Sequence, residues 1–151
     1  MKTNRLARAT AMGAAGLLVA LALSGCGGGL DVYVATPLDI NVVVGGRTDS
    51  GVHIRPGAVQ TVYLPVGQSI AFDASEPVTW TLIVGGTTIA GTGATVSYGG
   101  VYITPVTQTR SRVFIDTASD YPLGAPLSFT LIATSTLDDA QVATIQVGLT
   151  N

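Results

Sequence analysis

Apolar and polar residues alternate in short runs along most of the chain beyond residue 30. The clearest alternation runs through Trp80, Leu82 and Val84, and it returns in residues 127–134 and 141–149. Successive side chains of a strand point to opposite faces, so these runs indicate strands with one buried side and one solvent-facing side. No long window repeats apolar residues at the spacing of a helix. The pattern therefore predicts an all-β domain.

Short runs rich in Val, Ile, Thr, Tyr and Phe are separated by Gly, Pro, Asp and Ser, which is typical of a sandwich or barrel. We expect a single antiparallel β-sandwich with seven to nine principal strands, with a jelly roll or a small β-barrel as alternatives. The predicted strands are Asp31–Ala35, Asp39–Val44, Val52–Arg55, Val59–Leu64, Ser69–Asp73, Val78–Val84, Thr95–Tyr98, Val101–Thr104, Arg112–Asp116, Leu127–Thr134 and Gln141–Leu149.

The order of these features resembles bacterial immunoglobulin-like domains over roughly residues 38–149. Gly67–Phe72 is similar to their strand B, and Val78–Leu82 is similar to strand C with its core tryptophan. Leu127–Thr134 and Gln141–Leu149 are similar to the final F–G hairpin. The B–F disulfide of antibody domains is absent, because the chain has one cysteine. The resemblance implies two sheets that share one core.

The first 26 residues have a different pattern. Lys2, Arg5 and Arg8 precede an uncharged, mostly apolar run over residues 9–23. A membrane-spanning helix needs about 20 such residues, so this run is better interpreted as the core of a signal peptide. The run ends in Leu23-Ser24-Gly25-Cys26, which resembles the lipobox of bacterial lipoproteins. That resemblance implies cleavage before Cys26, a diacylglycerol on its sulfur and a fatty acid, such as palmitate, on the new amino terminus.

These features divide the chain into three parts: a signal peptide over residues 1–25, a lipidated cysteine with a glycine tether over residues 26–29, and a β-sandwich domain over residues 30–151. The residue after the cysteine is Gly27, whereas aspartate there commonly marks inner-membrane retention in this family. The resemblance therefore implies the outer membrane, with the domain in the periplasm or on the cell surface.

The charge of the mature chain narrows the list of partners. Beyond residue 25 there are four arginines, no lysine and nine acidic residues, a formal charge of −5. Nucleic-acid binding needs a basic patch that displaces counterions, so we expect no nucleic acid. The acyl chains, rather than electrostatic attraction to anionic lipid, are the expected contact with the bilayer.

The sequence carries no catalytic motif. His53 is the only histidine, and its apolar neighbours predict that it points outward from a strand. No G-x-S-x-G motif is present. One histidine and one cysteine cannot supply the three or four ligands of a zinc site. We therefore expect neither an enzyme nor a bound cofactor.

Four loop acids form the one candidate metal site. In the immunoglobulin-like order, Asp73 and Glu76 of the B–C loop lie at the same end of the sandwich as Asp138 and Asp139 of the F–G turn. Such carboxylates could bind Ca²⁺, which takes six to eight oxygen ligands. The alternative is ordinary turn chemistry, because Asp side chains end strands by bonding nearby backbone.

The expected function is that of a membrane-anchored, non-catalytic interaction or structural module of the bacterial envelope. An envelope protein is the expected partner, met through an apolar patch or an open edge strand. The alternative is a module that binds Ca²⁺ or carbohydrate through the loops at one end. Trp80 is assigned to the core, whereas Tyr63, Tyr98 and Tyr102 are candidates for exposed aromatic side chains.

Overall fold

A computed structural model describes residues 36–44 and 52–151, which belong to one compact unit, Thr36–Asn151. The proposed signal peptide, Cys26, the glycine tether and the predicted strand Asp31–Ala35 lie outside the described residues. The described part of the chain contains no helix long and apolar enough to cross a membrane.

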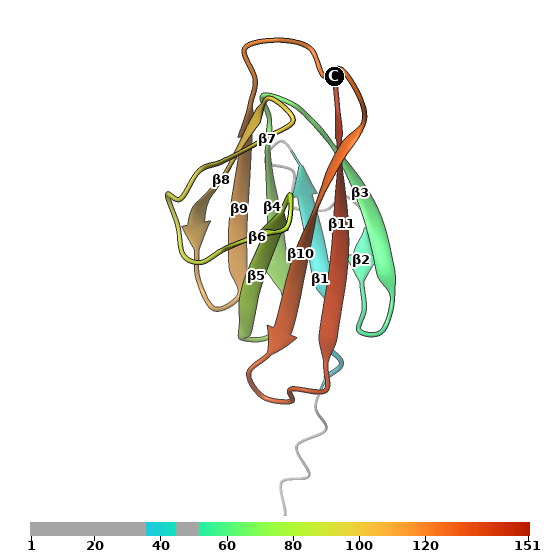
Figure 1. Ribbon diagram of the computed structural model, residues 1–151. Helices are drawn as coiled ribbons and strands as arrows, with labels where there is room; N and C mark the ends of the chain where they lie inside the picture. Colours follow the sequence, from blue (N-terminus) through green and yellow to red (C-terminus); the bar gives the residue numbers. More distant parts are fainter. Residues whose placement is uncertain (1–35, 45–51) are drawn as a thin grey trace, which may run out of the picture. The chain divides into compact units, whose positions relative to one another are not determined.

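The strands form two open sheets that face each other (Figure 1). The first sheet has the order β2-β1-β4-β9-β8-β7, and the second has the order β3-β11-β10-β5-β6. Eight of these eleven strands have five or more residues, which agrees with the predicted seven to nine principal strands. The strands are β1 (Ile40–Val44), β2 (His53–Ile54), β3 (Val59–Pro65), β4 (Ser69–Ala74), β5 (Val78–Val84), β6 (Thr87–Ile89), β7 (Val96–Tyr98), β8 (Val101–Gln108), β9 (Arg112–Ala118), β10 (Leu127–Ser135) and β11 (Val142–Thr150).

The strand order is that of an immunoglobulin-like sandwich. β1, β4, β9 and β8 occupy the places of strands A, B, E and D in one sheet, and β5, β10 and β11 occupy those of C, F and G in the other. The predicted fold class is therefore confirmed, and the barrel alternative is excluded because both sheets stay open. One detail differs: β3 pairs with β11 in parallel, with Val62 opposite Val147.

The core lies between the two sheets and comes from the inward half of each alternating strand. Phe72 on β4 and Phe129 on β10 are the largest of its fully buried side chains. Trp80 is 6% exposed, so its predicted place in the core is confirmed. At roughly 25 cal/mol per Å² of buried apolar area, this shared core is the main force that holds the sheets together.

β6 and β8 differ most from the sequence-based prediction, whereas the ends of the other described strands lie within two residues of their predicted positions. β6 was not predicted, because Thr87 and Thr88 follow two glycines and only three residues pair with β5. β8 continues to Gln108 beyond the predicted end at Thr104, since the irregularity between Pro105 and Thr107 lets pairing with β9 resume. A proline is tolerated in a strand at such a bulge.

Two glycines form the turn between β5 and β6. Gly85 and Gly86, which join β5 to β6, both have positive φ values, of 54° and 81°. Two consecutive residues with positive φ make a type I′ turn, whose twist matches that of the flanking strands.

The chain enters and leaves the sandwich at opposite ends. Where the chain enters the sandwich, the Leu38 amide donates a 2.6 Å hydrogen bond to the side-chain oxygen of Gln141, the residue just before β11. At its finish, the side-chain oxygen of Asn151 accepts a 2.6 Å hydrogen bond from the Leu123 amide in the loop between β9 and β10. We call these the entry end and the exit end.

Candidate functional site

The B–C loop and the F–G turn meet at the entry end, as predicted. The backbone amide and hydroxyl of Thr136, just after β10, both donate to the Pro77 carbonyl, at 3.0 and 3.1 Å. The B–C loop is also tied to the residue that precedes β1, because the Ser75 amide donates to the Asp39 carbonyl at 2.8 Å. The two loops are therefore neighbours at the entry end, and Asp73 lies in β4.

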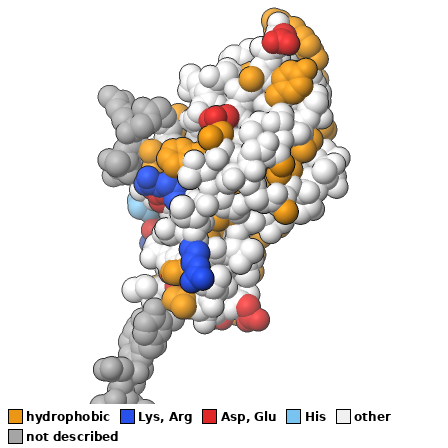
Figure 2. All heavy atoms as spheres, turned by 90° about the vertical axis from the view of Figure 1, so that its left-hand side faces the viewer, with side chains coloured by type: hydrophobic (Ala, Val, Ile, Leu, Met, Phe, Trp, Pro, Cys, Tyr) orange, Lys and Arg blue, Asp and Glu red, His pale blue; other side chains and the backbone are white. Residues whose placement is uncertain are grey.

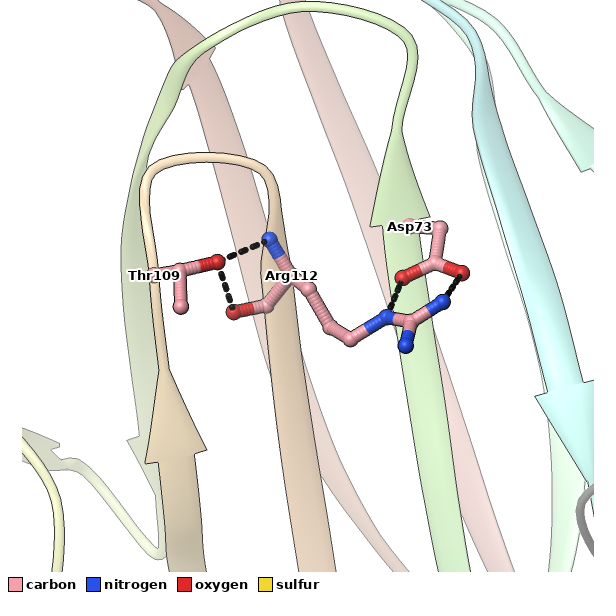
Figure 3. Close-up of polar contacts among 3 residues, drawn as sticks. All are labelled: Asp73, Thr109 and Arg112. Atoms are coloured by element: carbon pink, nitrogen blue, oxygen red, sulfur yellow. Dashed lines mark hydrogen bonds and ion pairs between the residues drawn. The ribbon is translucent and has the colours of Figure 1, made fainter.

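Asp73 is engaged by an arginine on the neighbouring strand. The Arg112 guanidinium donates to both carboxylate oxygens of Asp73, across the pair β4–β9 (Figure 3). The Arg112 amide is held in turn by the Thr109 hydroxyl at 3.0 Å. Hydrogen bonding to Asp73, and then its charge, raise the pKa of Arg112, so the arginine remains protonated. Asp73 thus serves a cross-strand ion pair on the outer side of the first sheet.

The other acids have separate environments. Asp138 accepts the Ala140 amide at 3.1 Å and the Gln141 side chain at 3.4 Å, which is ordinary turn chemistry. Asp139 is exposed. Glu76 is only 7% exposed, and its Oε1 has no hydrogen-bond partner. Within residues 36–44 and 52–151, no three His, Cys, Asp or Glu side chains gather in a way that could hold a metal ion.

His53 points outward from β2, as predicted. Its Nδ1 lies 2.9 Å from Asp39 Oδ2, and its side chain is 50% exposed. The pair links β2 to the residue before β1.

A shallow depression of about 290 Å³ lies on the outer side of the first sheet, near the exit end. Tyr102 of β8 is 45% exposed at its rim. The Ser69 hydroxyl donates to Asp116, which faces Thr104 on the other side, so three polar side chains form one row across β4, β9 and β8. An aromatic ring beside hydroxyl and carboxylate groups is an arrangement suited to a small polar ligand. The sequence predicted Tyr102 as a candidate exposed tyrosine. Its position near Asp116 depends on the register of β8 against β9, which the sequence pattern does not give.

The outer face of the second sheet has no charged side chain. We define this charge-free face by the outward positions of its strands: 59, 61 and 63 of β3; 79, 81 and 83 of β5; 88 of β6; the even positions 128–134 of β10; and the even positions 142–150 of β11. Half of these sixteen positions are threonine, and the others are Ser, Gln, Gly, Val, Ile and Tyr. The described charged residues lie in the first sheet or in loops.

The charge-free face also contains exposed apolar side chains. Val59 and Tyr63 on the edge strand β3 are 71% and 68% exposed. Tyr63 lies over Gly148 of β11, where a Cβ atom would meet its ring at 2.9 Å. The absence of a side chain at Gly148 therefore leaves room for the ring. By contrast, charged side chains form a few separate spots on a different side of the molecule (Figure 2).

Edge protection differs among the strands that border the two sheets. β2, β6 and β7 have two or three residues each, and such short edges offer little backbone for pairing with another chain. β3 has seven residues, no charge, and hydrogen-bonded neighbours on one side. The long, uncharged β3 edge and the charge-free face therefore form one continuous surface.

The chain matches no family model, no curated protein and no solved structure.

Proposed function

We propose that the protein is a lipoprotein of the bacterial envelope, attached through acyl chains on Cys26, whose domain is a non-catalytic binding module. The observation that carries this proposal is the Leu23-Ser24-Gly25-Cys26 sequence at the end of a charged and then apolar leader. The outer membrane is the proposed location, because Gly27 follows the cysteine. An envelope protein is the proposed partner.

The domain supports this role through the surfaces it leaves open. The chain enters the sandwich at one end, near Leu38, rather than across the middle of either sheet. The charge-free face offers a broad area with little desolvation cost from charged groups. Each acyl methylene buried in lipid contributes about 0.8 kcal/mol, and two or more chains make attachment durable.

Replacing the cysteine tests the anchor. We expect Cys26→Ala to prevent labelling by radioactive palmitate and to move the protein from the membrane pellet to the soluble fraction, because no acyl chain can be attached. Ser24→Ala, which keeps a small residue in the lipobox, is the matched control and should still be labelled. Palmitate labelling of the Cys26→Ala protein would contradict the proposal.

A second candidate function, binding of a neutral oligosaccharide, is favoured by the depression around Tyr102. A tyrosine ring can stack on a sugar face, and the Asp116 carboxylate and Thr104 hydroxyl can bond sugar hydroxyls. The negative charge of Asp116 disfavours acidic glycans.

We expect Tyr102→Ala to weaken binding of a neutral trisaccharide such as chitotriose or maltotriose about tenfold or more, as measured by calorimetry, because the stacking surface is lost. Tyr63→Ala, an exposed tyrosine on the other sheet, is the control and should bind as the unchanged protein does. An equal loss of trisaccharide binding in both variants would contradict the assignment of the binding site to the depression.

A further inference from the structure

We propose that the partner of the charge-free face is a second copy of this chain, and that two domains pair face to face through their second sheets. The pairing deepens the proposed function, and its orientation argument rests on the lipid anchor. The observations that carry it are the absence of charge from this face, its size, and the separation of the entry and exit ends.

The charge distribution makes this face the favourable one for self-association. The mature chain has a formal charge of −5, so two copies repel each other in general. In a twofold dimer each surface meets itself, and a charged surface would bring like charges together. The charge-free face avoids this cost, and its exposed Val59 and Tyr63 supply apolar area to bury.

The size of the face meets the requirement for a specific dimer. Five strands about 4.8 Å apart, over about seven residues at 3.3 Å each, give a projected area of about 500 Å² per copy. Two copies therefore bury about 1,000 Å², the lower bound for a specific interface. Two sheets can pack face to face with their strands within about 30° of each other.

Attachment of both copies to the same membrane favours face-to-face pairing over pairing of two β3 edges. A twofold axis parallel to the strands keeps both entry ends on the same side, so both Cys26 anchors can reach one membrane. Antiparallel pairing of β3 with its copy inverts one domain and places the two entry ends at opposite extremes of the dimer. Confinement to one membrane also raises the effective concentration of the second copy.

The test is crosslinking of the full chain in intact cells. Thr130→Cys places a thiol on β10, the middle strand of the charge-free face, and Ala118→Cys places one on the outer side of the first sheet. The reagent is a bis-maleimide with a spacer longer than about 7 Å. A direct disulfide would require the two Cα atoms to lie within that distance. The unchanged chain controls for reaction at Cys26.

We expect Thr130→Cys to give a species of twice the mass and Ala118→Cys to give none. Adding Ile132→Asp to Thr130→Cys should lower the yield about tenfold or more, because each copy then buries a carboxylate without a partner. A cooperative melt of the Ile132→Asp protein establishes that it is folded. No product from Thr130→Cys, equal yields at both positions, or a product with a different protein would overturn self-pairing.

The same samples distinguish the pairing from the anchor. Crosslinked dimers in the soluble fraction would contradict the lipid anchor and the argument that both entry ends point to one membrane. They would still support pairing through the charge-free face. Membrane-bound protein that does not crosslink at Thr130→Cys would retain the anchor and reject the pairing.

Discussion

Leu131→Asp is expected to abolish folding, whereas Ile132→Asp, one residue further along the same strand, is expected to leave the domain folded. Leu131 is fully buried and lies between Leu82 and Ile145 of the neighbouring strands. A carboxylate there has neither water nor a cation nearby, so the loss in the free energy of unfolding should reach about 4 kcal/mol or more. Ile132 faces outward on the charge-free face and is partly exposed.

The measurement is urea unfolding of the purified chain, followed by the fluorescence of Trp80, the only tryptophan. Leu131→Asp should show no cooperative transition. Ile132→Asp should unfold cooperatively, with stability within about 1 kcal/mol of the unchanged chain. Similar losses in both variants would mean that the inward and outward assignments of β10 are wrong.

Phe72→Ala is the second large effect that we expect, at about 3–5 kcal/mol of unfolding free energy. Phe72 is fully buried on β4, which is hydrogen-bonded to β1 and β9 on its two sides. Because both neighbours fix the backbone of β4, the sheet cannot collapse into the space that the ring leaves. The cost therefore contains a cavity contribution as well as the lost burial.

The matched control is Tyr63→Ala, which removes an aromatic ring that is 68% exposed on β3. Its expected cost is below about 1 kcal/mol, because the ring contacts the sheet mainly at Gly148. The urea midpoint should fall strongly for Phe72→Ala and slightly for Tyr63→Ala, at an unchanged dependence on urea. Equal midpoints would contradict the assignment of Phe72 to the shared core.

The alternation of side chains predicted most strands of this fold, because a period of two is a property of each strand alone. Val78–Val84 was predicted with its observed bounds. β10 extends one residue beyond its predicted end, and β11 begins and ends one residue later than predicted. What alternation does not contain is the partner of each strand. The parallel pairing of β3 with β11 arises because the turn around Pro56 and Gly57 moves the chain from one sheet to the other.

The candidate sites show the same limit. The resemblance to immunoglobulin-like domains predicted that Asp73 and Asp138 lie at one end, but not that Arg112 would engage Asp73. That ion pair joins residues 39 positions apart, and it depends on the register of β4 against β9. The charge-free face is likewise invisible in any single strand, because threonines from five strands form one surface only after the strands are ordered.

The opposite placement of the entry and exit ends has a mechanical consequence. A pulling force applied between Thr36 and Asn151 acts along the strands, because Thr36 precedes β1 at the entry end and Asn151 follows β11 at the exit end. β11, which carries the load from Asn151, is hydrogen-bonded along its length to β10 and β3. Its hydrogen bonds are therefore loaded together in shear, rather than opened one after another as in a peeled hairpin. This geometry suits a domain that is held at one end and pulled from the other.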